Sequence, residues 1–356
     1  MFKERVQRIR SALEPGQAFL VTGETNRFYF TGFHSSAGSV LFTPNEAVFL
    51  IDFRYYEKAA ATVDGCRVQL CKKLFEEVGE ICAANDIKEL FIEANVISIG
   101  RLASMREALP NVTISEENRF DLLVEEMRTV KNQKELSLIR EAQRMTDETF
   151  TYILNHIAAG RSERDIMLDM EFYMRRLGSE GVSFDFIVVS GKNSSLPHGV
   201  PTDKLVQAGD FITMDFGAVV GGYHSDMTRT VAVGSATDEM RLVYDTVLKA
   251  QLESEKVIRA GAVCKDVDKV ARDIIYAAGY EGCFGHGLGH SVGVEIHESP
   301  AFSPNCDTIL RAGTVMTVEP GIYLENKFGV RIEDMVYVTD EGSINLTASP
   351  KNLIIL

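Results

Sequence analysis

The feature that most restricts the fold of this chain is a pair of aspartates inside one apolar stretch. Residues 211–230 read FITMDFGAVVGGYHSDMTRT. Two apolar runs flank a glycine-rich centre, and this pattern predicts a β-hairpin with a tight turn. Burying a carboxylate costs several kcal/mol unless a counter-charge or hydrogen bonds compensate it. A fold that buries this hairpin must therefore supply partners for both Asp215 and Asp226.

The spacing of the two aspartates predicts how they face each other. A turn at Val220–Gly221 places Asp215 directly opposite Asp226, with Cβ atoms about 4.5–5.5 Å apart, and Thr213 and Thr228 flank them on the same face. Like charges at this separation repel, and one pKa rises unless a cation lies between them. A hard divalent metal ion is the natural counter-charge. The alternative is a solvated edge with two exposed aspartates, but the apolar residues of both strands favour burial.

A second group of metal-ligand residue types follows at residues 284–298, FGHGLGHSVGVEIHE. Four glycines alternate with His286, His290 and His297, so the segment is not a zinc-binding helix of the HExxH type. Glycine instead lets the main chain approach a ligand closely. Three histidines in such a segment favour a ligand or catalytic role over a structural one. His198, in the polar loop SGKNSSLPHGVP, is unremarkable when taken alone.

Two glutamates stand in later apolar runs, Glu319 in TVMTVEPGIY and Glu333 in GVRIEDMVYV. A single buried glutamate could simply pair with Arg331. Two more carboxylates beside the aspartates and a histidine suit a dinuclear metal site, whose ions lie about 3.5–4 Å apart and need several carboxylates to neutralise them.

The chain changes its pattern of secondary structure near residues 120–130. Before this point, extended segments alternate with helices expected at 1–13, 73–85 and 98–109, which predicts an α/β layer domain. The extended segments are QAFLVTG, RFYFTGF, SVLFTP, AVFLIDFRY, RVQLCK, KELFIEA and NVTISEE. After it, long helices are expected at 131–158, 162–177, 236–260 and 265–278, among strands that predict one curved antiparallel sheet, an α+β domain. We expect domains over residues 1–123 and 124–356.

Composition narrows the classes of partner. The 356 residues carry 37 basic and 51 acidic side chains, a formal charge of −14, so no basic excess is available to bind nucleic acid or an anionic membrane. The six cysteines form no CxxC pair and follow no disulfide framework, which favours a reducing, cytoplasmic location. No run approaches about 18 apolar residues, so no membrane-spanning segment is expected.

Four segments, in the order MDFGA…GYHSDMTRT, FGHGLGHSVGVEIHE, MTVEPGIY and VRIEDM, resemble the metal-dependent peptidases of the pita-bread fold. Within that family the chain is similar to the proline-specific branch, aminopeptidase P and Xaa-Pro dipeptidase (prolidase). The resemblance covers residues 124–356, and the first 120 residues resemble the creatinase-type N-terminal domain. It implies cleavage of the Xaa-Pro bond of proline-containing peptides by attack of a metal-bridging hydroxide.

The resemblance also implies roles for individual residues. Two divalent metal ions are implied, with manganese first and cobalt, iron or zinc as alternatives. Matching positions make the five metal ligands Asp215, Asp226, His290, Glu319 and Glu333, of which Asp226 and Glu333 bridge both ions. Glu319 is also the implied proton shuttle, His297 stabilises the tetrahedral intermediate, and His198 and His286 contact substrate. Arg331, Tyr223 and Thr228 hold ligand carboxylates in place.

The choice between dipeptidase and aminopeptidase P rests on one position. Prolidases of this family often place an arginine just after the segment that corresponds to His297–Glu298, whereas this chain has Ala301 there. This favours aminopeptidase P, although Arg311 or a loop residue could substitute. The resemblance further implies a homodimer. The rival hypotheses are a creatinase-like non-peptidase hydrolase and an inactive member that acts as a binding module.

Overall fold

The computed structural model describes residues 1–356, which separate into two compact units, Met1–Arg128 and Thr129–Leu356. Each unit is built around its own buried apolar residues. None of the helices combines the length and the apolar composition needed to cross a membrane.

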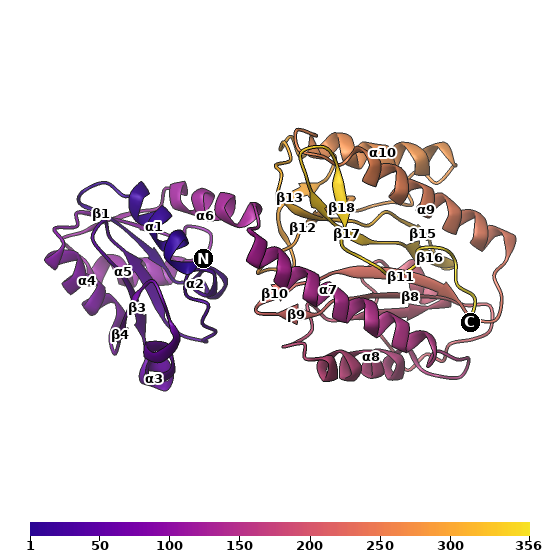
Figure 1. Cartoon of the computed structure of the whole chain (residues 1–356), viewed down its shortest axis with the longest axis horizontal. Helices are drawn as coiled ribbons and strands as arrows, with labels where there is room; N and C mark the ends of the chain where they lie inside the picture. The colour runs from indigo at the N-terminus through magenta and orange to yellow at the C-terminus, as the bar shows by residue number, and fades with distance from the viewer. The chain divides into compact units, whose positions relative to one another are not determined.

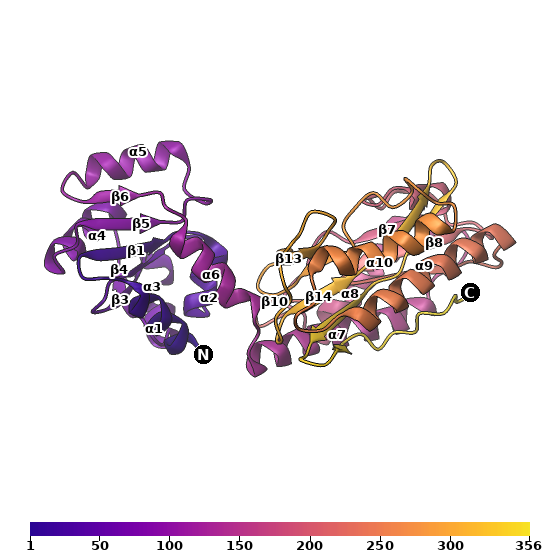
Figure 2. The same ribbon diagram turned by 90° about the horizontal axis from the view of Figure 1, so that it is seen from above.

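The first unit is a six-stranded sheet with helices packed on it, in the strand order β4-β3-β2-β1-β5-β6 (Figures 1 and 2). Only β2 runs antiparallel to its neighbours. This confirms the predicted α/β layer. The strands are β1 Gln17–Val21, β2 Ser39–Phe42, β3 Ala47–Ile51, β4 Arg67–Leu70, β5 Glu89–Ile92 and β6 Thr113–Ser115. The helices are α1 Phe2–Ala12, α2 Glu24–Thr31, α3 Phe53–Thr62, α4 Leu74–Ala84, α5 Ile99–Ala108 and α6 Arg119–Thr129.

One predicted strand of this unit is wrong, because RFYFTGF belongs to helix α2 and the turn after it. Five consecutive residues of α2, from Arg27 to Thr31, are buried, so the helix shows no apolar–polar period in the sequence. A fully buried helix and a buried strand cannot be distinguished by periodicity alone. Gly32 ends the helix with a positive φ of 65°, a conformation that glycine adopts without strain.

The second unit, called the catalytic unit below, holds four long helices in two packed pairs. Figure 1 shows α7 beside α8 and α9 beside α10, with the strands between the pairs. The bounds lie close to those predicted: α7 Gln133–Leu154, α8 Glu163–Leu177, α9 Asp238–Val257 and α10 Cys264–Ala277. Side chains cap three of the N-termini, where Asn132, Ser162 and Thr237 each accept a hydrogen bond from a main-chain N–H of the first turn.

The strands of the catalytic unit form several antiparallel ladders where the sequence predicted one curved sheet. The larger ladders have the orders β11-β8-β7 and β13-β12-β14-β17-β18, and β9 with β10 and β15 with β16 form two-stranded ladders. Glu333 N donates to Thr228 O (3.1 Å), so the two larger ladders meet beside the predicted ligands. The bounds are β7 Ile187–Ser190, β8 Phe211–Phe216, β9 Val219–Val220, β10 Tyr223–His224, β11 Met227–Ala232, β12 Gly289–Ser291, β13 Glu298–Phe302, β14 Val315–Val318, β15 Gly321–Leu324, β16 Phe328–Arg331, β17 Asp334–Val338 and β18 Ser343–Asn345, with a 3₁₀ helix η1 at Gly191–Ser195.

Candidate metal centre

The two strands of the hairpin pair in a register that differs from the predicted one. In the ladder of β8 and β11, Asp215 lies opposite Thr228 and Phe216 lies opposite Met227. The predicted face-to-face pairing of Asp215 with Asp226 is therefore wrong.

The turn of the hairpin explains the shift in register. Its two central residues are Gly221 and Gly222, both with positive φ (55° and 72°), and Val220 pairs with Tyr223 on either side. A two-residue turn of this type needs a positive φ at both central positions, which a β-branched valine adopts only with strain. The glycine pair therefore moves the turn one residue beyond the predicted Val220–Gly221.

Both aspartates nevertheless line one cavity. Asp226 lies just before β11, two residues along the chain from Thr228, and residues two apart on a strand share a face. A diagonal pair of this kind is separated by about 7–8 Å, wider than the predicted direct pair. The main chain is tight between them, because a Cβ at Gly217 would lie 1.9 Å from Ser225 O. Only glycine fits at this position.

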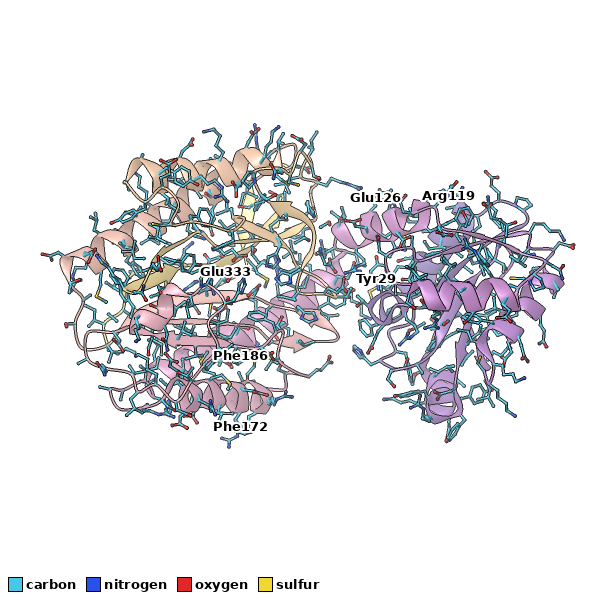
Figure 3. All side chains as sticks on the ribbon, turned by 180° about the vertical axis from the view of Figure 1, so that it is seen from behind. Tyr29, Arg119, Glu126, Phe172, Phe186 and Glu333 are labelled. Carbon is cyan, nitrogen blue, oxygen red and sulfur yellow. The ribbon has the colours of Figure 1, made fainter.

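The five predicted ligands all line this cavity, which has a volume of about 820 Å³. His290 Nε2 lies 3.6 Å from Asp226 Oδ2 and 3.4 Å from Glu319 Oε1. The nearest ligand atoms of Asp226, His290 and Glu333 lie within 4.8 Å of one another. In Figure 3, Glu333 lies in the middle of the catalytic unit, whereas Phe172 lies at its outer surface on α8. Residues from several strands thus meet at one point.

Arg331 donates hydrogen bonds to four groups around the cluster. Its guanidinium donates to Asp215 Oδ2 (2.6 Å), Thr228 Oγ1 (3.0 Å), Tyr323 OH (2.8 Å) and Pro197 O (3.1 Å). Thr228 and Arg331 were predicted to hold ligand carboxylates, and these contacts place both of them against the cluster. Burial opposes the charge on Arg331, but Tyr323, Asp215 and Glu319 raise its pKa well above the usual value, so the side chain is cationic.

Further hydrogen bonds orient the glutamates and histidines. Thr228 Oγ1 donates to Glu333 Oε2 (2.6 Å), and Thr317 Oγ1 donates to Glu319 Oε1 (3.1 Å) while accepting from His290 N (2.9 Å). Each of these carboxylates is therefore held through one oxygen.

Burial has the largest effect on the pKa values of the acidic residues in the cluster. Burial raises the pKa of Asp226 and of Glu333 well above the usual range, and neighbouring carboxylates raise both further. Burial also raises the pKa of Glu319 to about 8 and lowers the pKa of His290 to about 4. A neutral imidazole is the form that binds a metal ion.

Three buried carboxylate oxygens in this cluster accept no hydrogen bond: Asp215 Oδ1, Asp226 Oδ1 and Glu333 Oε1. Buried polar atoms in proteins are nearly always bonded, so these oxygens require another partner. Four carboxylates with one imidazole match the donor set that divalent cations such as manganese bind. The residues present therefore fit the implied metal ions.

The three other predicted histidines also line the cavity. The ring of His297 lies edge-on to that of His290, with centroids 4.5 Å apart. His286 Nε2 lies 2.9 Å from Tyr323 OH, and burial lowers the pKa of His286 to about 4. His198 is exposed on the segment that follows η1. The walls between these residues are largely apolar, with Phe184, Phe186, Pro197, Val200 and Ile296 among them.

The loop that carries His297 is shaped by the neighbouring Glu298. Its carboxylate accepts from Val294 N (3.0 Å) and Glu295 N (3.3 Å), and Lys131 Nζ lies 3.1 Å from its other oxygen. The side chains of Lys131 and Glu298 are both almost completely buried. His297 therefore projects from a fixed loop.

Tyr223 was predicted to hold ligand carboxylates but lies away from the cluster, and two residues that do contact the cluster were not predicted. Tyr223 is buried in β10, where its hydroxyl donates to Glu135 Oε1 (2.9 Å), and it does not line the cavity. Tyr323 and Thr317, which contact the cluster residues directly, were not predicted. Thr317 lies two residues before Glu319, so alternation along β14 is a signal that could have found it, whereas Tyr323 lies on the next strand, β15, and no local pattern marks it.

Comparisons with known proteins agree with this geometry. Residues 137–340 match the metallopeptidase family M24, and residues 5–130 match the creatinase/prolidase N-terminal domain. The chain is 41% identical over 341 residues to the uncharacterized peptidase YqhT of Bacillus subtilis, covering 95% of each chain. Among solved structures it is similar to an Xaa-Pro dipeptidase from Bacillus anthracis (TM-score 0.94, 39% identity, 100% of both chains). It is also similar to an X-Pro aminopeptidase from Thermotoga maritima (TM-score 0.93, 36% identity, 99% of both chains).

Proposed function

Because the chain belongs to metallopeptidase family M24, we propose that it hydrolyses the bond between an N-terminal residue and a following proline. The observation that carries this proposal is the set of three buried carboxylate oxygens without a hydrogen-bond partner, on residues that line one cavity with His290 and three further histidines. The names of the similar structures, an Xaa-Pro dipeptidase and an X-Pro aminopeptidase, support the choice of an Xaa-Pro substrate.

We propose that this cluster holds two divalent metal ions, manganese first. Asp215 would hold one ion, His290 and Glu319 the other, and Asp226 and Glu333 would bridge them. When bound, such ions lower the pKa of water so that a hydroxide nucleophile is present near neutral pH. The fixed positions of Thr228 and Arg331 support this assignment, because their bonds to one oxygen of Glu333 and of Asp215 leave the other oxygen without a hydrogen-bond partner.

The remaining steps fall to the side chains of the cavity. Glu319 would carry the proton to the leaving proline nitrogen at its carboxylate oxygens, since this carboxylate lines the cavity and lies 3.4 Å from His290 Nε2. His297 would donate to the oxyanion, and His198 and His286 would orient the peptide.

The walls of the cavity support an aminopeptidase P-like reaction over a dipeptidase. Arg331 is the only arginine or lysine that lines the cavity, and its guanidinium is already bonded to four groups. Ala301, at the position where prolidases of this family often have an arginine, also lines the cavity. The cavity lining therefore presents no uncommitted arginine or lysine for the free carboxylate of a dipeptide.

The test is hydrolysis by the purified full chain of Gly-Pro and of an Xaa-Pro-Xaa tripeptide, with added manganese and after chelation. We expect tripeptide cleavage that chelation abolishes and manganese restores. The variant Asp226→Ala is expected to lose activity together with bound metal. If neither peptide is cut with manganese present, the proposed function is wrong, and if Asp226→Ala keeps full activity, the metal assignment is wrong.

A further inference from the structure

A buried glutamate outside the metal cluster holds both ends of the segment that carries His198. Glu163 is the first residue of α8 and is completely buried (0% exposed). It does not line the cavity and has no part in the reaction proposed above. A buried carboxylate without a basic partner must be compensated by hydrogen bonds, so the identity of its donors indicates its role.

The two oxygens of Glu163 bind opposite ends of residues 190–202, which we call the His198 segment. Oε1 accepts from Ser190 N (2.7 Å) and Ser190 Oγ (2.9 Å), where β7 ends. Oε2 accepts from Thr202 N (3.1 Å) and Thr202 Oγ1 (2.7 Å), at the other end. Asn193 Nδ2 donates to both oxygens (3.2 and 3.3 Å). One side chain therefore closes the segment into a loop.

The middle of the His198 segment forms part of the cavity wall. Pro197, His198, Gly199, Val200 and Pro201 all line the cavity. Arg331 also holds this region through Pro197 O, and Gly329 N donates to Ser194 Oγ (2.9 Å). His198 is exposed, so its direction is set by the main chain of the segment more than by packing of its own ring.

We propose that Glu163 is a positioning residue, whose carboxylate fixes both ends of the His198 segment so that His198 faces the cavity. This inference rests on the proposed role of His198 toward the peptide. In Glu163→Gln the side-chain amide has one oxygen that can still accept hydrogen bonds, but its NH₂ group faces the N–H and O–H donors of either Ser190 or Thr202. The hydrogen bonds to that residue are therefore lost. A small displacement of a substrate-contacting group lowers catalysis steeply.

The chain offers a closely matched control in the other unit. Glu93 is also completely buried and accepts from Thr22 N (2.5 Å), Thr22 Oγ1 (3.4 Å), Gly23 N (2.6 Å) and Asn26 Nδ2 (2.8 Å). Glu93→Gln therefore makes the same chemical change in a carboxylate with the same kinds of donor. The urea-unfolding midpoints of the two variants then compare the stability cost of this change in the two units.

The experiment measures kcat and KM for an Xaa-Pro-Xaa tripeptide with the full chain and manganese. We expect Glu163→Gln to lower kcat/KM between about tenfold and a hundredfold, with metal content unchanged, while Glu93→Gln stays within about twofold of wild type. In a His198→Ala background, Glu163→Gln should add less than about a twofold loss, because both changes act through the same side chain. Equal losses in the two Gln variants, or losses that multiply in the double variant, would overturn the proposal.

A second pair of variants keeps the test decisive if Glu163→Gln does not fold. Thr202→Val removes the hydroxyl that donates to Oε2 with little change in shape, and Thr202→Ser keeps it. We expect the serine variant to retain wild-type kcat/KM and the valine variant to lose activity, and equal activities would contradict the proposal.

Amide hydrogen exchange separates failure of this inference from failure of the proposed function. Glu163→Gln should speed exchange selectively within residues 191–201, whether or not the peptide is cut. If wild type cuts no Xaa-Pro peptide, the proposed function fails while this readout still decides the role of Glu163. Unchanged exchange in that segment would overturn the positioning role.

Discussion

Replacement of Arg331 by methionine should destabilise the metal-free catalytic unit by removing the counter-charge of Asp215. Arg331 is 3% exposed, and its guanidinium donates to Asp215, Thr228, Tyr323 and Pro197. Methionine has a similar length but no donor, so Asp215 stays buried with neither a cation nor its 2.6 Å bond. Removing one partner of a buried ion pair costs about 3–5 kcal/mol, and the burial of both groups means that solvent screens little of this.

The assay is urea unfolding of metal-free protein at pH 7, followed for wild type, Arg331→Met and Arg331→Lys. We expect the free energy of unfolding of the catalytic unit to fall by about 3–5 kcal/mol in the methionine variant. The lysine variant keeps the charge but loses the planar fork, so a loss of about 1–2 kcal/mol is expected. Saturating manganese should return part of the loss, because a cation beside Asp215 replaces the missing counter-charge.

Two results would refute this reasoning. If metal-free Arg331→Met unfolds at the wild-type urea concentration, Asp215 does not depend on Arg331. If the lysine and methionine variants lose the same amount, the hydrogen-bond geometry of the guanidinium and not its charge determines the stability.

Three more predictions follow from the same site. Since burial raises the pKa of Glu319 from 4.5 in the unfolded chain to about 8, the folded state becomes less stable as pH rises through this range. The lowered pKa values of His286 and His290, about 4, act in the opposite direction below about pH 6.5. The melting temperature of metal-free protein should therefore fall between about pH 6.5 and 8, and a flat profile there would contradict the burial of Glu319. Gly217→Ala should cost at least about 3 kcal/mol in urea unfolding, because its Cβ would lie 1.9 Å from Ser225 O. Gly100→Ala on α5 meets no atom within 4 Å and should be neutral or slightly stabilising. Finally, Ala-Pro amide should be cut at least as fast as Ala-Pro, because no uncommitted arginine or lysine lines the cavity. A preference of about a hundredfold for the free acid would show that a cation binds its carboxylate.

Several features of the fold could be predicted from the sequence because they depend on local properties. The long helices α7 to α10 follow from apolar residues at three- and four-residue spacings and from capping residues such as Asn132 and Ser162. The α/β and α+β patterns of the two units were likewise confirmed. Helix α2 was not predicted because five consecutive residues of it, Arg27 to Thr31, are buried and show no apolar–polar period.

The residue types of the candidate site could be predicted from the sequence, but the pairing of the hairpin strands was predicted wrongly. The acids and histidines stand out in the sequence because charged and titratable residues are rare within apolar or glycine-rich runs. The hairpin register was predicted wrongly, although the Gly221–Gly222 pair in the sequence favours the observed turn, and a shift of one residue in the turn changes every cross-strand pair. The homodimer and the cytoplasmic location stay predictions.

The sequence by itself thus determined the type and order of the reactive groups, which are covalent facts about the chain. The tertiary structure alone decided which distant residues are joined by hydrogen bonds to the same side chain. Arg331 joins Asp215 to Pro197, and Glu163 joins Ser190 to Thr202, through hydrogen bonds that span 27 to 134 positions. No periodicity records such bonds, because hydrogen bonds between distant segments depend on how whole ladders and helices pack before any two side chains can meet.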